Sequence, residues 1–300
     1  MLVPVRPPSK YKQARLYGGP ALSHNLFRDN FTISTWLLLG AIAQGLVCAV
    51  VPLRYAIWPA VLMLSWGALE SLLATLGWKE NQQMKGVVLG KFSAQIPDRE
   101  GEFADKPSGH GVVLILLSAR SNHPLGILGP GYKQVGDYMT KMQSQLAKSA
   151  DKFGYLGHTS WIEANGRTTA NTVMTATYFR TVEELHLYAH SPLHKKVWRW
   201  WNSIAKTHPH LSINHELYHA PENCWETIYA NCHPLGMAAT ETKVKVADGP
   251  DGPEYQWVGS MVDASRGGMR SQTGRMNLSD GSDNANKYGV DPYAAPVMPT

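Results

Sequence analysis

Seven of the twelve histidines in this 300-residue chain lie between Leu185 and Ala220, together with three of its ten tryptophans. Histidine titrates near neutral pH and binds transition metals, so this stretch could remove a proton from a substrate, hold a metal ion or ligate a haem. It could also be ordinary packing. These four interpretations differ in the spacing and in the elements that they require.

His186, His190 and His194 are spaced at i, i+4 and i+8, which on an unbroken helix would place three imidazoles together as in a metal site. The intervening Ser191-Pro192 argues against an unbroken helix, because serine is a common N-cap and proline is favoured at the first helical position. The one HExxH string, HELYH at 215–219, lies in a predicted strand, whereas this metal motif requires both histidines on one face of a helix. We therefore expect no metal site. We interpret His186 and His190 as hydrogen-bonded residues at a helix end, with His190 also a candidate for binding substrate.

His194 is the best candidate for a general base. The second helix is predicted from Pro192 to about Lys206. Its core-facing stripe consists of Leu193, Val197, Trp200 and Ile204. His194 flanks this stripe on the same surface as Trp198 and Trp201, four and seven residues later. We expect both tryptophans to hold a flat or unsaturated substrate by stacking.

The strand predicted for LSINHELYH carries further polar candidates. Successive residues of a strand point to opposite faces, so His215 and Glu216 lie on different faces, and Tyr218 shares the face of Glu216. Glu216 is either exposed and inert or partnered by Tyr218 in a cavity, and we favour the cavity. The predicted catalytic residues are His194, His215, Glu216 and Tyr218. The predicted substrate-binding residues are Trp198, His158, His190 and Trp201.

The elements that must position these residues follow a clear order. A buried strand at 111–120 precedes an amphipathic helix at 132–153. Two strands at 155–164 and 171–179 follow, joined by a loop that contains the hairpin signal Asn165-Gly166. The histidine-rich helices and the last strand complete the order strand, helix, strand, strand, helix, strand. This order is typical of an α+β, ferredoxin-like domain, whose helices cover one face of the sheet.

Two apolar segments precede this domain. Residues 33–51 carry no charge and are long enough to cross a bilayer, and residues 55–78 carry only Glu70. We predict a transmembrane helical hairpin at 33–78, with a hairpin buried on the soluble domain as the alternative. The nearby basic residues are Arg6, Lys10, Lys12, Arg15 and Arg28 before the first segment, and Arg54 between the two. The positive-inside rule then places the N-terminus and everything after the hairpin in the cytosol, and we expect the endoplasmic reticulum membrane.

Composition divides the rest of the chain. Residues 1–32 are predicted as a cytosolic N-terminal segment, 79–109 as a linker, 110–237 as the ferredoxin-like domain and 238–300 as a disordered tail. The tail is rich in Gly, Ser, Asp and Asn and contains the sequon Asn277-Leu-Ser. The net charge of +5 comes from scattered basic residues, so nucleic acid is not an expected partner. The three cysteines cannot form a closed disulfide framework, which fits a reduced compartment.

Four motifs in order resemble a known family. They are GKFSAQIP from Gly90, YFRTVEELHLYAHSPLHKKVW from Tyr178, NHELY from Asn214 and WETIYANCHPLGM from Trp225. From about residue 81 to residue 237, the chain is similar to the fungal and bacterial monooxygenase-like family typified by the fumagillin-pathway polyketide monooxygenase. That family is a branch of the antibiotic-biosynthesis monooxygenases. Its patterns fall here on His194 with Trp198, on His215, Glu216 and Tyr218, and on Glu226, Tyr229 and Asn231. Leu217 and Cys232-His233 depart from the family pattern.

The resemblance implies a ferredoxin-like dimeric α+β barrel that inserts oxygen into a polyketide- or terpene-like intermediate of specialised metabolism. It implies O₂ as co-substrate and neither metal nor flavin, with a base that deprotonates an acidic substrate so that the carbanion can reduce O₂. The expected partners are a small lipophilic metabolite, the membrane and a second copy of the chain. Two alternatives stay open. Related barrels bind haem through a helix histidine, which would be His194 or His190 here, and a barrel without activity could bind a metabolite or scaffold a pathway.

Overall fold

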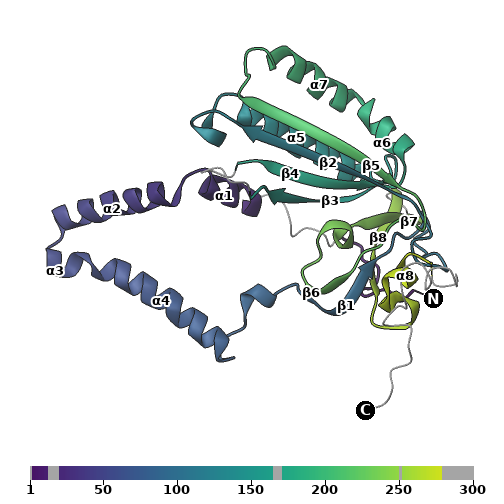
Figure 1. Ribbon diagram of the computed structural model, residues 1–300, viewed down its shortest axis with the longest axis horizontal. Coiled ribbons are helices and arrows are strands. Elements are labelled where there is room, and N and C mark those ends of the chain that lie inside the picture. The colour runs from purple at the N-terminus through teal and green to yellow at the C-terminus, as the bar shows by residue number, and fades with distance from the viewer. Residues whose placement is uncertain (1, 13–19, 165–170, 250–251, 279–300) are drawn as a thin grey trace, which may run out of the picture.

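The computed structural model describes residues 2–12, 20–164, 171–249 and 252–278. A four-stranded antiparallel sheet forms its centre, in the order β3-β4-β2-β5. The strands are β2 (Val112–Ser121), β3 (Tyr155–Ile162), β4 (Val173–Phe179) and β5 (Leu211–Ala220). Helices α5 (Tyr132–Lys148), α6 (Val182–Ala189) and α7 (Pro192–Ile204) lie together on one face of this sheet (Figure 1). The ferredoxin-like order predicted from the sequence is therefore confirmed, while the predicted turn at Asn165-Gly166 lies outside the described residues.

The predicted break between α6 and α7 is also present. Thr181 caps α6 by accepting a hydrogen bond from the Glu184 amide at 3.2 Å. Ser191 caps α7 by accepting from the His194 amide at 3.4 Å, and Pro192 occupies the first turn. Both caps satisfy amides that a helix start leaves without partners. The break places His190 at the end of one helix and His194 at the start of the next.

The core between the sheet and these helices is aromatic and aliphatic. It contains Val113, Leu146, Ala150, Phe153, Tyr155, Phe179, Leu185 and Tyr188. Burial of each large apolar side chain contributes roughly 1.5–3 kcal/mol. The Phe153 and Tyr188 rings meet edge to face with centroids 5.3 Å apart, which joins the turn after α5 to α6. This packing fixes α6, and through it the start of α7, over the sheet.

Two segments that composition predicts to be irregular are folded. β1 (Val88–Ala94), within the predicted linker, lies between β6 (Tyr229–Cys232) and β9 (Met261–Asp263) in a three-stranded sheet. β7 (Glu241–Gly249) and β8 (Gly252–Gly259) form a hairpin within the predicted tail.

The prediction of disorder from residue 238 is therefore wrong as far as residue 278, and residues 279–300 lie outside the described part of the chain. Few aliphatic residues suffice because they are buried against a surface that the rest of the fold provides. Val262 and Ala264, for example, are 0% exposed. The compositional argument fails because it assumes that the segment must form a core by itself.

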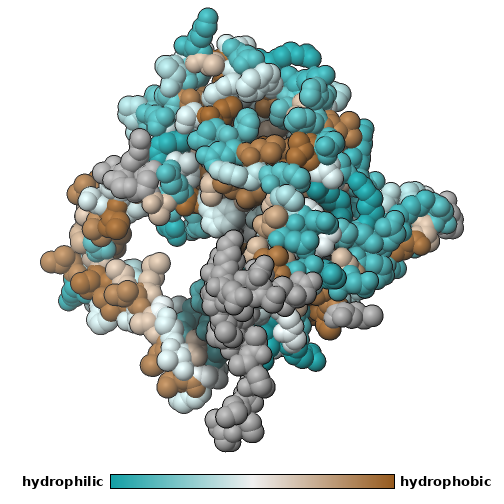
Figure 2. Space-filling view, turned by 45° about the vertical axis from the view of Figure 1, so that its right-hand side comes forward, coloured by the Kyte–Doolittle hydropathy of each residue, from teal (hydrophilic) through white to brown (hydrophobic). Residues whose placement is uncertain are grey.

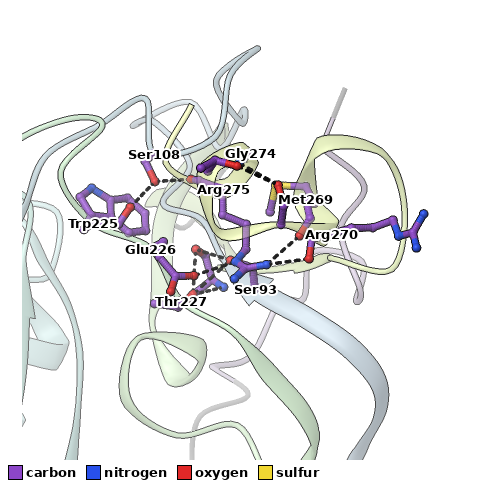
Figure 3. Close-up of polar contacts among 12 residues, drawn as sticks. Ser93, Ser108, Trp225, Glu226, Thr227, Met269, Arg270, Gly274 and Arg275 are labelled. Atoms are coloured by element: carbon purple, nitrogen blue, oxygen red, sulfur yellow. Dashed lines mark hydrogen bonds and ion pairs between the residues drawn. The ribbon is translucent and has the colours of Figure 1, made fainter. Parts of the chain in front are cut away.

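A buried ion pair ties the end of this segment to the domain (Figure 3). Arg275 lies in α8 (Gln272–Arg275), and its Nε donates to the Glu226 carboxylate at 2.7 Å. Its Nη1 donates to the carbonyl oxygens of Met269 and Arg270 at 3.1 Å each. The Ser108 hydroxyl donates to the Arg275 carbonyl oxygen at 2.7 Å. These contacts join α8 to the chain that precedes β2 and to the chain that precedes β6.

Helices α2 (Ile33–Val50), α3 (Leu53–Ala56) and α4 (Trp58–Thr75) form an arm that extends away from the sheet (Figure 1). Its two helical runs, Ile33–Val50 and Leu53–Thr75, could cross a membrane by length and composition, and 0% and 6% of them are buried. Brown and white residues cover most of the arm in the space-filling view (Figure 2). The structure therefore does not have the alternative arrangement, a hairpin buried on the domain. The remaining short helices are α1 (Pro20–Asp29), η1 (Gln82–Met84), η2 (Gly126–Leu128), η3 (Gly236–Ala239) and η4 (Gly267–Arg270).

Candidate active site

A cavity of about 570 Å³ lies between the central sheet and helices α5, α6 and α7. Its polar lining residues are Gln143, Thr177, Tyr188, His186, His190, His194, Lys195, Arg199 and His215. Its apolar lining residues are Ile115, Leu117, Met139, Met142, Leu146, Phe179, Leu185, Ala189, Trp198 and Leu217. The volume falls in the range of small-molecule sites, and an apolar lining with a few polar groups is their usual composition.

His194 combines the properties of a general base. The side chain lies in the first turn of α7, and its ring meets the Tyr188 ring edge to face with centroids 5.7 Å apart. Burial lowers the pKa of His194, and positive charge on His215 and His190 lowers it further, against a raising effect of the hydrogen bond to the Ala189 carbonyl. His194 is therefore neutral near neutral pH. A neutral imidazole has one unprotonated ring nitrogen, which can accept a proton.

Three other predicted site residues join His194 in the cavity. Trp198 lies one helical turn after His194 and is 53% exposed, which places it at the mouth. His190 is exposed, and its Nδ1 pairs with the His186 carbonyl oxygen at 2.8 Å, as expected for a residue at a helix end. His215 reaches the cavity from β5. The structure thus gathers residues from two helices and one strand around one space.

Glu216 and Tyr218 are not in this cavity. Both are exposed, and the Tyr218 hydroxyl donates to the Glu216 carboxylate. Each follows a cavity-lining residue of β5, His215 or Leu217, so strand alternation directs it to the opposite face of the sheet. The prediction that Glu216 and Tyr218 share one catalytic edge with His194 is therefore wrong in its geometry.

His158 and Trp201 also lie outside the cavity lining. β3 is the edge strand opposite β5, so His158 and His215 are on different sides of the sheet's width. His158 pairs with the Tyr155 hydroxyl, and burial, with the nearby Lys12 charge, lowers its pKa to about 4. Trp201 packs against the cluster around Leu211. Both residues are packing residues, because their positions on a strand face or helix face point to the core and not to the space under α7.

Several lining residues were not predicted from the sequence. Met139 and Met142 belong to the apolar stripe of α5, but periodicity alone cannot separate a cavity wall from a packed core. Lys195 and Arg199 could have been predicted from the sequence. Their i, i+4 spacing places them on one side of α7, and they directly follow His194 and Trp198.

The family motif near the end of the domain has a structural role. Glu226 is the partner of Arg275. The Tyr229 ring stacks on Phe92 with centroids 5.2 Å apart. The Asn231 side-chain oxygen accepts from the Gly90 amide at 2.8 Å. Together these contacts join β6 to β1 and to the C-terminal segment, so the motif braces the fold at a distance from the cavity.

Comparison with known proteins places the chain. The family described as "Monooxygenase af470-like" matches residues 112–237, which run from the start of β2 into η3 and include the cavity. Monooxygenase af470 of Aspergillus fumigatus is 34% identical over 253 residues, which is 84% of this chain and 90% of that protein. The chain belongs to this family of monooxygenases. The identity extends well beyond the matched domain, so the family relationship covers most of the chain.

Solved structures are far more distant. A crystal structure of an aldoxime dehydratase with butyraldoxime matches 47% of this chain and 33% of its own, with 14% identity and a TM-score of 0.34. SnoaB, a cofactor-independent oxygenase from Streptomyces nogalater, matches 36% of this chain and 91% of its own, with 9% identity and a TM-score of 0.25. Neither likeness is strong enough to bear on the chemistry of the cavity.

Proposed function

We propose that this protein is a membrane-anchored monooxygenase that places one atom of O₂ into a lipophilic polyketide- or terpene-like intermediate of specialised metabolism, without metal or flavin. The observation that carries the proposal is His194, a histidine with a lowered pKa and an unprotonated ring nitrogen, in a largely apolar cavity. Membership of a monooxygenase family supports the reaction type. The fold and the lining support a small organic substrate.

His194 acts as the base in this proposal. It takes a proton from an acidic C–H group of the substrate, and the carbanion transfers an electron to O₂. The two radicals combine to a peroxide anion, which regains the proton from His194. A hydroperoxide on a CH₂ carbon then loses water and leaves a carbonyl, so one oxygen atom enters the product and the other becomes water. The substrate supplies the electrons, and no external reductant is consumed.

The other cavity residues bind and stabilise. His215 donates a hydrogen bond to the enolate or peroxide oxygen, where negative charge develops. Trp198 covers an unsaturated substrate by stacking at the mouth. Met139 and Met142 offer flexible apolar contacts along α5.

The test is oxygen labelling. Purified protein, treated with a chelator, is given ¹⁸O₂ and candidate substrates chosen from the products of neighbouring biosynthetic genes. We expect one ¹⁸O atom per product molecule. Substrate that stays unconsumed under O₂ would support the alternative of a barrel that only binds or scaffolds. Unlabelled product would contradict oxygen insertion.

Haem is the alternative group for this cavity. His194 would hold the haem iron, because a neutral imidazole is the form of histidine that ligates metals and its lowered pKa keeps it neutral. Bound haem would supply redox chemistry at its iron. A Soret band in protein purified from haem-fed cells, lost in His194→Ala, would favour haem over the cofactor-free reaction.

Membrane anchoring is supported by how α1 meets the domain. Asn30 is buried just before α2, and its side-chain oxygen accepts from the Ile127 amide of η2 at 2.8 Å. Phe27, Phe31 and Trp36 pack edge to face with centroids 5.5–6.1 Å apart at the start of the first apolar helix. Aromatic rings gather at membrane interfaces in this way. η2 precedes α5, so the membrane end of the chain is held close to a cavity wall.

The proposed orientation places the catalytic domain in the cytosol, at the endoplasmic reticulum. The sequon at Asn277 is a poor reporter, because its side-chain nitrogen donates to Asn223 at 3.2 Å. Cys224 is exposed and free, and serves better. We expect a membrane-impermeant maleimide to label it in sealed microsomes, and Cys224→Ser to abolish most of the label. Labelling that requires detergent would place the domain in the lumen.

The open face of the sheet supports the proposal of a homodimer. Tyr218 is 52% exposed there, on the edge strand β5. Pairing with a second sheet would cover this face, and a Tyr218→Lys substitution would disfavour pairing by burying a charge. Light scattering of the detergent-solubilised protein should give twice the chain mass, and a chain mass at micromolar concentration would contradict the dimer.

A further inference from the structure

The mouth of the cavity carries two cationic side chains with no acidic counterpart. Lys195 and Arg199 line the cavity, are exposed and lie one turn apart on α7. None of the residues that line the cavity is an aspartate or a glutamate. Within the described part of the chain, no carboxylate forms a salt bridge with either residue, whereas Arg275, Arg99 and Lys243 each have one. The mouth therefore has an unbalanced positive charge.

The buried part of the cavity lining is mostly apolar. Leu146, Phe179 and Leu185 are each nearly completely buried. The cavity thus has cationic side chains where it is exposed and mostly hydrocarbon where it is buried. Lysine and arginine remain charged over the whole physiological range, so this asymmetry does not depend on the histidines.

We propose that the cavity selects an amphiphilic carboxylic acid, with its carboxylate bound by Lys195 and Arg199 and its apolar chain extending inward to Phe179. The arginine fork can hold both carboxylate oxygens, and the lysine adds a point charge. This inference rests on the proposed function, because it names the substrate class for the same cavity. The carboxylate itself does not react. Its attachment at the mouth uses remote binding energy to hold the reacting carbon near His194.

The test compares two ligands that differ only in the head group. Octanoate and octanol are titrated into the full-length protein in nanodiscs at pH 7.5, with binding measured by calorimetry. We expect octanoate to bind at least about tenfold more tightly than octanol, since hydrogen bonds to charged groups are worth roughly that much. The preference should shrink as salt is added, because both cations are exposed.

Variants assign the preference to its residues. The double variant Lys195→Gln/Arg199→Gln should bind both ligands alike, with octanol affinity unchanged, which shows that the cavity is intact. Lys196→Gln is the matched control, because Lys196 lies on the same helix and does not line the cavity. It should keep the full preference.

Three results would overturn the inference: equal binding of both ligands by the unsubstituted protein, a preference that survives in the double variant, or binding of neither ligand. None of these measurements needs O₂ or turnover. Failure of ¹⁸O₂ incorporation would therefore contradict the proposed reaction while a head-group preference stood, and equal binding beside normal labelling would contradict only the carboxylate site.

Discussion

Strand β5 presents two unlike faces. On the face that the helices cover, His215 and Leu217 line a cavity of about 570 Å³. On the other face, Glu216 and Tyr218 are exposed, and the hydrogen bond and negative charge of Glu216 raise the pKa of the Tyr218 hydroxyl, so Tyr218 stays protonated. Both faces carry groups that could move a proton. The cavity lies beside the groups of the first face.

The difference shows that neighbours in a sequence motif need not share a site. The NHELY stretch contains every polar type that a catalytic edge would need, but the sheet separates its residues alternately. The cavity lies on one face, between the sheet and the helices α5, α6 and α7. The other face is covered near the start of β2 by residues of β1 and by Trp225, in a hydrophobic core cluster.

The strongest test of this comparison is loss of the base. His194→Ala should lower turnover about 10²–10⁴-fold, the usual value of a general base, because the cavity keeps its shape but loses its proton acceptor. Steady-state kinetics with circular dichroism would check activity and folding together. His219→Ala is a matched control on β5 outside the cavity lining and should keep near-normal turnover.

The pH profile sharpens the same assignment. The base must be neutral, and the pKa of His194 lies below the ordinary histidine value of about 6.5. The decline of turnover on acidification should therefore be centred below pH 6.5. A decline centred at or above 6.5, or the same inflection in the residual activity of His194→Ala, would contradict the role of His194.

The chain segments that cover the other face of the sheet should contribute to stability and not to turnover. Arg275→Ala leaves Glu226 without its partner in a mostly buried place and should lower the free energy of unfolding by about 3 kcal/mol or more. Arg266→Ala removes an exposed partner of Asp263 and should cost at most about 1 kcal/mol. Urea denaturation of both variants would measure the difference. Equal, small losses would mean that the C-terminal segment is not held as described.

His158 lies on the same face of the sheet as the cavity. It is largely buried, but it does not line the cavity. Its pKa is about 4 in the folded chain and about 6.5 when unfolded, so the folded state binds fewer protons between these values. The stability is complete above pH 6.5 and should fall by about 3 kcal/mol as the pH drops to 4. In His158→Gln this acid loss should shrink, as measured by urea denaturation at pH 7 and pH 4.5. Turnover of the variant at pH 7 should change little, whereas a loss comparable to that of His194→Ala would restore His158 to the site.

The smallest effect is expected at Glu216 and Tyr218, on the face of β5 opposite the cavity. Glu216→Gln and Tyr218→Phe keep the size of each side chain and remove the charge or the hydroxyl. Because neither lines the cavity, each variant should retain turnover within about twofold, well short of the loss expected for a catalytic group. A loss of a hundredfold in either variant would mean that this face also contacts substrate.

The local features of this protein follow from short stretches of its sequence. Thr181 and Ser191-Pro192 specify the two helix starts, since a cap is a contact within one turn. The uncharged run from Ile33 to Val50 specifies an exposed apolar helix, because its composition leaves no polar face. The order of strands and helices led to the ferredoxin-like topology, and the flank position of His194 led to the cavity.

Contacts between residues far apart in the chain depend on the three-dimensional fold. Arg275 pairs with Glu226, which is 49 residues away in the sequence, and no sequence periodicity predicts such a pair. Val262 is buried against a surface that lies outside its own segment. The composition of that segment therefore led to a wrong prediction of disorder. The same reason explains the site. Alternation placed His215 and Glu216 on opposite faces, but which face would carry a cavity depended on how α6 and α7 pack over the sheet, and helix packing sums many weak contacts that no short stretch of sequence contains.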